Sequence, residues 1–181
     1  MRRLVLWLVG VAALATALAP HAAARGDGWS ALQRPLHLPH LAQGAACPVS
    51  HADRSVHFDR FGIARGIGPG PAYPIGLAHG VLVLVPSPEG GVWAGQKVLW
   101  FVHPRYRGPV LVRGRRLDGA GLVRFGRGVL PARELRLPAG TSEQPSFTRL
   151  RSLGCYAYQI DGVGFSRVIV FRATGSLGRA P

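Results

Sequence analysis

The chain has 181 residues and carries 22 Lys and Arg against 8 Asp and Glu, for a formal net charge of +14. That length fits one domain with enough chain to bury a core, and the lack of asparagine excludes N-linked glycosylation. The charge favours anionic partners such as phosphate polymers, acidic glycans or lipid head groups. Lys97 is the only lysine, however, and abundant Arg, Ala, Gly and Pro are also what a GC-rich coding sequence produces, so the charge has a compositional interpretation as well.

Residues 1–24 contain the three parts of a secretory signal peptide. Arg2 and Arg3 make the basic start, residues 4–19 are almost entirely apolar, and small residues ending at Ala24 form an A-x-A site. A membrane-spanning helix needs about 20 apolar residues, which is more than this run offers. We therefore expect a protein that is secreted or held in the cell envelope, with an uncleaved N-terminal anchor as the alternative.

The composition divides the rest of the chain into three parts. Residues 25–46 are rich in Pro and Gly and show no hydrophobic period, which predicts a flexible leader. Residues 47–173 hold the apolar runs and predict the folded domain. Residues 174–181 are small and polar, which predicts a disordered tail.

Short apolar runs separated by turn residues are the dominant pattern of residues 47–173. Such spacing without a 3.6-residue period predicts an all-β fold with almost no helix, an antiparallel immunoglobulin-like β-sandwich of about 7–9 short strands. Residues 66–76, rich in Gly and Pro, are expected to be a loop. The expected strands are residues 81–85, 97–102, 110–115, 122–125, 134–137, 147–151, 155–161 and 165–172, with 56–63 as a further candidate.

Two Asp-Gly pairs predict hairpins, because Asp-Gly supports the positive-φ turns that join antiparallel strands. Asp118-Gly119 would join residues 110–115 to 122–125, and Asp161-Gly162 would join the last two strands. Those last strands are apolar on both faces, which is typical of the middle of a sheet. Trp100 lies in an apolar run and, by analogy with immunoglobulin domains, is expected to pack in the core near a disulfide.

Cys47 and Cys155 are the only cysteines. An even pair in an exported chain predicts a disulfide, which would close a loop of about 100 residues. Two buried free thiols are the alternative.

Two stretches carry a resemblance: KVLWFVHPRYRGPVLVRGRRLDG at residues 97–119 and GCYAYQIDGVGFSRVIVFRA at residues 154–173. Together they resemble a group of uncharacterised exported β-domain proteins of high-GC Gram-positive bacteria. The resemblance implies an exported bacterial β-domain. That group has no assigned activity, so the resemblance implies no catalytic or binding residue.

No motif in the sequence indicates a catalytic, cofactor or metal site. His37 and His40 have the spacing of helical zinc ligands, but Pro39 between them argues against a helix. The Gly164-x-Ser166 pattern lacks the second glycine of a nucleophile elbow. We therefore expect no catalytic residue, no cofactor and no metal.

The arginines of residues 105–127 are the strongest surface signal. Arg113 and Arg115 share one face of their strand by the period of two, and a basic face with an aromatic residue suits an anionic polymer. A solvated outer face is the alternative interpretation. The candidate anion-binding residues are Arg105, Tyr106, Arg107, Arg113, Arg115, Arg116 and Arg124.

These observations favour an exported, non-enzymatic module that binds anionic envelope material, either polymer or lipid surface. An exported hydrolase acting on envelope glycan and a structural domain that docks another exported protein are the alternatives. Specific nucleic-acid binding is not expected.

Overall fold

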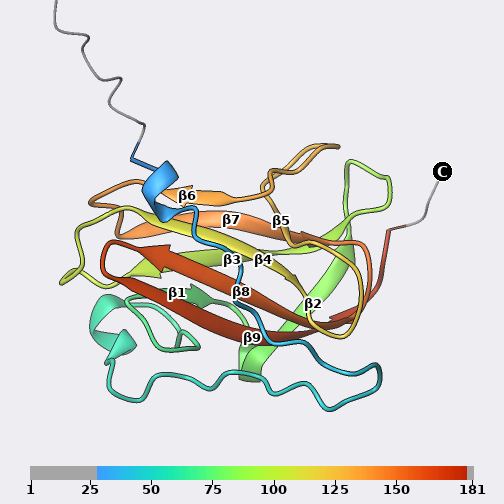
Figure 1. Ribbon diagram of the computed structural model, residues 1–181, viewed down its shortest axis with the longest axis horizontal. Coiled ribbons are helices and arrows are strands. Elements are labelled where there is room, and N and C mark those ends of the chain that lie inside the picture. Colours follow the sequence, from blue (N-terminus) through green and yellow to red (C-terminus); the bar gives the residue numbers. More distant parts are fainter. Residues whose placement is uncertain (1–27, 179–181) are drawn as a thin grey trace, which may run out of the picture.

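The computed structural model describes residues 28–178, which form nine β-strands and three short 3-10 helices (Figure 1). The predicted signal peptide, residues 1–24, lies outside the described residues. The helices are η1 (Ser30–Leu32), η2 (Phe58–Phe61) and η3 (Ala78–Gly80). The strands are β1 (Ala72–Ile75), β2 (Val81–Pro86), β3 (Ala94–Val102), β4 (Val110–Arg116), β5 (Arg124–Phe125), β6 (Leu135–Leu137), β7 (Glu143–Leu150), β8 (Gly154–Gly162) and β9 (Phe165–Gly175).

The strands form one folded-over sheet in the order β5-β7-β3-β2-β9-β8-β4-β6, with β1 also paired to β3. Strand β2 joins the two halves, because residues 81–84 pair with β9 and residues 85–86 pair with β3. The result is nearly a barrel. The all-β prediction is confirmed, but the fully antiparallel arrangement is wrong at one place: β2 and β9 run parallel.

The core lies between the two halves of the sheet. Trp100 of β3 and Tyr158 of β8 meet edge to face, with ring centroids 5.1 Å apart, and neither side chain is exposed. The core position predicted for Trp100 is therefore confirmed. Its predicted proximity to the disulfide is wrong, because Cys155 and Tyr158 are three positions apart on β8 and point to opposite faces of the strand.

Residues 34–50, which we call the strap, cross the outer face of β4, β8 and β9 (Figure 1, blue to cyan). Leu38 of the strap packs against Leu117, Ala157 and Val170. This segment is a packed layer of the domain rather than the separate leader expected for residues 25–46. The prediction was wrong because residues of the sheet, and not residues within the segment, supply the apolar and hydrogen-bond partners of the strap.

The strap is held by polar side chains that reach its backbone. Gln159 accepts a hydrogen bond from the His37 amide at 2.7 Å and donates one to the Pro35 carbonyl at 2.9 Å. Further along, the Leu41 amide donates to the Leu117 carbonyl at 2.8 Å. Prolines remove donors from the strap, so these contacts with β8 and with the end of β4 replace a regular strand ladder.

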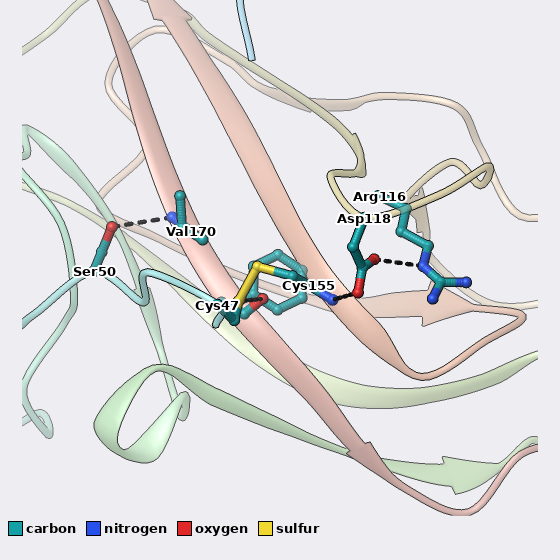
Figure 2. Close-up of a disulfide and its surroundings, with 7 residues drawn as sticks. Cys47, Ser50, Arg116, Asp118, Cys155 and Val170 are labelled. Carbon is teal, nitrogen blue, oxygen red and sulfur yellow. Dashed lines mark hydrogen bonds and ion pairs between the residues drawn. A yellow bond between two sulfur atoms is a disulfide. The ribbon is translucent and has the colours of Figure 1, made fainter. Parts of the chain in front are cut away.

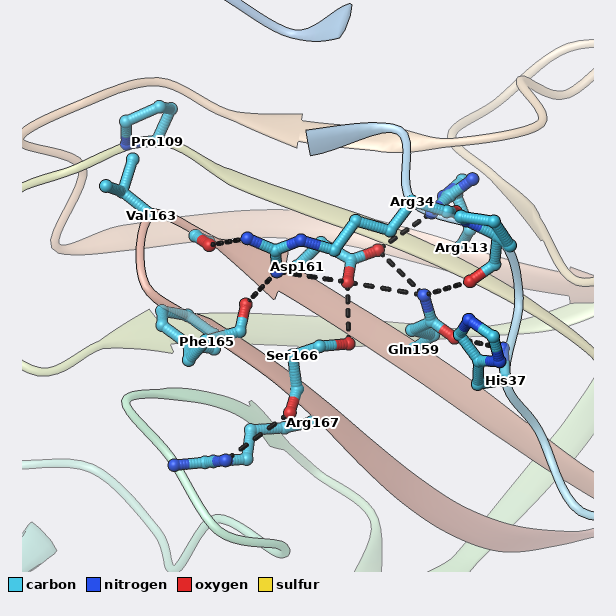
Figure 3. Close-up of polar contacts among 12 residues, drawn as sticks. Arg34, His37, Pro109, Arg113, Gln159, Asp161, Val163, Phe165, Ser166 and Arg167 are labelled. Carbon is cyan, nitrogen blue, oxygen red and sulfur yellow. Dashed lines mark hydrogen bonds and ion pairs between the residues drawn. The ribbon is translucent and has the colours of Figure 1, made fainter. Parts of the chain in front are cut away.

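Asp161 anchors the start of the strap (Figure 3). Its carboxylate is fully buried and accepts hydrogen bonds from Arg113 at 2.8 Å and from Ser166 at 2.7 Å. The Arg34 guanidinium lies 3.6 Å from the same carboxylate and also donates to the Gly162 and Phe165 carbonyls. The predicted hairpin between β8 and β9 is confirmed, but its turn is Val163-Gly164, because Asp161 and Gly162 still pair with β9. Asp161 instead joins the strap to the sheet.

Four local predictions differ from the structure. Residues 56–63 contain η2 instead of a strand, and residues 66–76 contain β1 in place of a continuous loop. The chain turns at Asp118-Gly119 as expected, but β5 leaves β4 after the Arg115–Leu122 bridge and pairs with β7. Strand β9 extends to Gly175, beyond the predicted domain end at 173, because its last residues pair with β2.

Candidate anion-binding site

The predicted disulfide is present between Cys47, near the end of the strap, and Cys155 of β8 (Figure 2). Next to it, the Cys155 amide donates to Asp118 at 3.2 Å, and the Ser50 hydroxyl accepts from the Val170 amide at 3.0 Å. A disulfide indicates an oxidising compartment outside the cytoplasm. Within residues 28–178, no helix is long and apolar enough to cross a membrane.

The predicted arginine face is not one surface. Arg113 and Arg115 do share a face, but the strap covers it: Arg113 donates to the Arg34 carbonyl and to Asp161, and Arg115 donates to the Leu38 carbonyl at 3.3 Å. Their guanidinium groups are hydrogen-bonded to the protein itself. These two arginines hold the strap and are not free for an external anion.

Arg105, Tyr106 and Arg107 lie in the loop before β4, at the opposite end of that strand from Arg116 and the β4–β5 turn. Arg105 and Arg107 are exposed. The Tyr106 hydroxyl donates to the Pro109 carbonyl and accepts from the Val163 amide, both at 2.8 Å. Tyr106 therefore braces two neighbouring turns, and its hydroxyl is already occupied.

Arg116 is neutralised in place. Its Nε donates to Asp118 at 2.6 Å, and its Nη1 donates to the Ser152 hydroxyl at 3.3 Å. The hydrogen bond that Arg116 donates to Asp118 is the largest influence on the pKa of Arg116 and raises it. An anion would have to compete with that carboxylate.

Arg124 is the remaining predicted residue, and it lines a pocket of about 330 Å³ that we call the Arg124 pocket. Arg151 and Trp93 form another wall, with the Arg151 guanidinium 4.2 Å from the Trp93 ring centroid. The other walls hold Ser152 and Tyr156, and no acidic residue lines the pocket. The side chains come from β5 and the residues just before it, from the turn between β7 and β8, from the residue before β3 and from β8.

The electrostatics of the Arg124 pocket are dominated by like charges. Partial burial lowers the pKa of Arg124, and the positive charges of Arg133 and Arg151 lower it further. Its Nε is buried and has no hydrogen-bond partner. Over residues 28–178, none of Arg124, Arg133 and Arg151 forms an ion pair with a carboxylate. An anion entering the pocket would relieve this repulsion.

Sequence reasoning found Arg124 but missed Arg133, Arg151 and Trp93. The sequence gives no sign that β5 pairs with β7. Strand β5 is only two residues long, and in that pairing Arg124 is directly opposite Arg149. Residues 25 positions apart in the sequence are thereby brought to one edge. Arg149 lies on the same face as Arg124, and Arg151, in the turn after β7, lines the same pocket as Arg124.

The hydrolase alternative needs a cleft with converging acids or histidines. A pocket of about 580 Å³ near η2 is lined by Asp53, His57 and Asp59. Asp53 accepts hydrogen bonds from Ser55, at 2.6 Å from its hydroxyl, and from the Tyr73 hydroxyl at 3.0 Å. The Ser55 hydroxyl is the main cause of the lowered pKa of Asp53, which suits a structural acceptor better than a general acid.

Among the described residues, no three His, Cys, Asp or Glu side chains converge as a metal site. Comparison of the chain with protein-family models, curated proteins and solved structures found no match.

Proposed function

We propose that this chain is an exported, non-enzymatic β-domain that binds anionic groups of the cell envelope through the Arg124 pocket. The observation that carries the proposal is the set of three arginines, Arg124, Arg133 and Arg151, gathered at one edge without a carboxylate partner. Unneutralised arginines around a pocket are a feature of phosphate and carboxylate sites, because guanidinium groups donate in pairs to such anions.

The pocket supplies more than charge. Arg151 is stacked on Trp93, so its planar group is oriented before a ligand arrives. The Ser152 hydroxyl lies 2.7 Å from the Tyr156 hydroxyl, which places a polar group on the pocket wall between the arginines and the core. Pre-oriented donors reduce the entropy lost on binding.

Isothermal titration with inorganic polyphosphate tests the proposal, at low and at high salt. Arg124→Gln/Arg151→Gln should weaken binding about tenfold or more, because two phosphate contacts are lost. Arg60→Gln/Arg172→Gln is the matched control, with the same change in charge at two exposed arginines on other parts of the domain. It should stay within about twofold of the parent protein, since long-range effects are screened.

Equal weakening by both double variants would mean that net charge alone attracts the polymer, and the site assignment would then be wrong. Absence of polyphosphate binding at low salt would remove the proposed function.

We also propose an immunoglobulin-like strand arrangement. Immunoglobulin domains place strands A, B, E and D in one sheet and C, F and G in the other. The order β1-β3-β7-β5 corresponds to the first set, and β4-β8-β9 to the second, with β6 beside β4. The arrangement departs from that pattern in one respect, because β5 precedes β6 in the chain.

A tyrosine supports the same assignment. Immunoglobulin-like domains carry a tyrosine at the corner before strand F, whose hydroxyl bonds to a backbone carbonyl a few residues upstream. Here the Tyr156 hydroxyl donates to the Ser152 carbonyl at 2.9 Å, across the turn between β7 and β8. Backbone proton contacts measured by NMR across the β1–β3 and β2–β9 pairings would test this assignment, and their absence would contradict it.

A further inference from the structure

The loop between β5 and β6 exposes apolar side chains at its tip. Val129 is 72% exposed and Leu130 is 91% exposed, the largest values among the exposed large apolar residues of the described chain. The loop projects from the sheet (Figure 1). Two neighbouring apolar side chains at the end of a projecting loop are costly in water, since each loses the benefit of burial.

The base of the loop is held firmly. Phe125 and Ala132 exchange backbone hydrogen bonds, both at 2.9 Å, and Phe125 is buried in the core. Gly126 and Gly128 adopt left-handed backbone angles, with φ of 83° and 88°, which lets the chain turn sharply on each side of Arg127. The tip is thus presented on a closed, anchored turn.

Arginines lie on both sides of the tip along the chain, and Glu89, beside Gly128 and Arg127, is already bonded to Arg149. Arg127 lies 5.2 Å from the Phe147 ring centroid, and exposed Arg133 follows the tip in the chain. Arg124, at the start of the loop, continues this charge into the Arg124 pocket. An apolar tip with arginines nearby in the loop suits the boundary between lipid head groups and acyl chains.

We propose that this loop docks the protein on an anionic lipid bilayer, with Val129 and Leu130 entering the acyl boundary while Arg124, Arg127 and Arg133 contact lipid phosphates. The inference rests on the proposed function, because it identifies an anionic lipid surface as the envelope material that the Arg124 pocket meets. The arginines supply attraction to the surface, and the tip supplies the apolar contact that a soluble polyanion lacks.

Vesicle flotation tests the docking, with equimolar phosphatidylglycerol and phosphatidylcholine compared with phosphatidylcholine alone. The parent protein should float with the anionic vesicles only. Val129→Ser/Leu130→Ser should weaken that binding about tenfold, because two apolar side chains no longer enter the membrane. Val163→Ser is the matched control, since Val163 is 64% exposed on a different turn and should be neutral.

Polyphosphate titration separates this inference from the proposed function. Val129→Ser/Leu130→Ser should bind polyphosphate within twofold of the parent protein, because no arginine is changed. Parent protein that binds polyphosphate but not anionic vesicles would overturn the lipid inference and leave the proposed function standing. Binding of neither probe would overturn both.

A second measurement locates the tip directly. Leu130→Trp should be quenched by vesicles whose acyl chains carry bromine, beyond the quenching seen for the native tryptophans. Unchanged vesicle binding by Val129→Ser/Leu130→Ser, or no added quenching of Leu130→Trp, would show that the tip stays outside the bilayer and would overturn the inference.

Discussion

Arg113 Nη2 lies 2.8 Å from Asp161 Oδ2, in an ion pair whose carboxylate has no exposed surface. The same nitrogen donates to the Arg34 carbonyl, so one guanidinium joins β4, β8 and the strap. This relationship decides the role of Arg113, since a group that neutralises a buried charge is not available to a ligand.

Arg113→Met should therefore destabilise the domain severely. The substitution leaves Asp161 without its closest cationic partner, and breaking a buried ion pair from one side costs about 3–5 kcal/mol. Urea unfolding measures the change. Arg105→Met, at an exposed loop position, should change the free energy of unfolding by less than about 0.5 kcal/mol. A loss below about 1 kcal/mol for Arg113→Met would show that Arg34 neutralises Asp161 adequately alone.

Cys47→Ala/Cys155→Ala should lower the free energy of unfolding by about 4–5 kcal/mol, because the bond closes a loop between residues 108 positions apart. The bond also ties the strap to β8, so amide hydrogen exchange should increase first in residues 34–50. A reductant should destabilise the parent protein by a similar amount and leave the double alanine variant unchanged. An effect of reductant on that variant would contradict this account.

Asp118 makes stability depend on pH. Partial burial acts to raise the pKa of Asp118, but hydrogen bonds from Arg116 and the Cys155 amide outweigh it and hold the pKa below the usual 3.8. A carboxyl whose pKa is lowered on folding stabilises the protein above its unfolded value, and the contribution disappears as the pH falls through the folded value.

Asp118→Asn should accordingly cost about 1.5 kcal/mol between about pH 5 and 8. The difference from the parent protein should shrink below about pH 4. Unfolding free energies of both proteins over this range measure it. A difference that stays constant down to about pH 2 would show that the charge of Asp118 is not responsible.

Thr148 and Tyr158 form a buried hydrogen bond whose contribution to stability can be measured. Their hydroxyl oxygens lie 2.7 Å apart, and both residues are fully buried. Burial is the main cause that raises the pKa of Tyr158 above its usual value. Tyr158→Phe should cost about 1–3 kcal/mol, because the Thr148 hydroxyl loses its partner.

Thr148→Val/Tyr158→Phe should recover most of that loss, since both polar groups are then gone while the shape of the core is kept. Thermal or urea unfolding of the single and double variants completes the cycle. A double variant that is less stable than Tyr158→Phe alone would contradict the argument.

The parts of the fold that depend on neighbours in the chain could be predicted. Apolar runs identified most strands and the local hairpin of β8 and β9, although its turn lies at Val163-Gly164 and not at Asp161-Gly162. The disulfide followed from the even pair of cysteines. The apolar residues on both faces of β8 and β9 predicted a central place in the sheet. This is confirmed, because the two strands lie between β2 and β4, with the core on one face and the strap on the other.

The candidate site could be predicted only in part. Arg113, Arg115 and Arg124 look alike in the sequence, yet two are covered by the strap and one lines a pocket. Whether an arginine is covered depends on where the strap lies. The strap backbone is hydrogen-bonded by the side chains of Gln159, Arg113 and Arg115, which are far from it in the sequence. A Pro- and Gly-rich stretch carries no periodic signal of such a contact.

The sequence by itself therefore determined the β class, the local hairpin, the cysteine pairing and the basic character of the surface, because each is a property of composition or of neighbouring residues. Only the tertiary structure decided that β2 runs parallel to β9, that residues 34–50 cover the outer face, and which arginines remain without a carboxylate. The physical reason is that charge and hydrogen-bond donors are neutralised or left free by partners up to about a hundred residues away, and the folded chain alone brings those partners into contact.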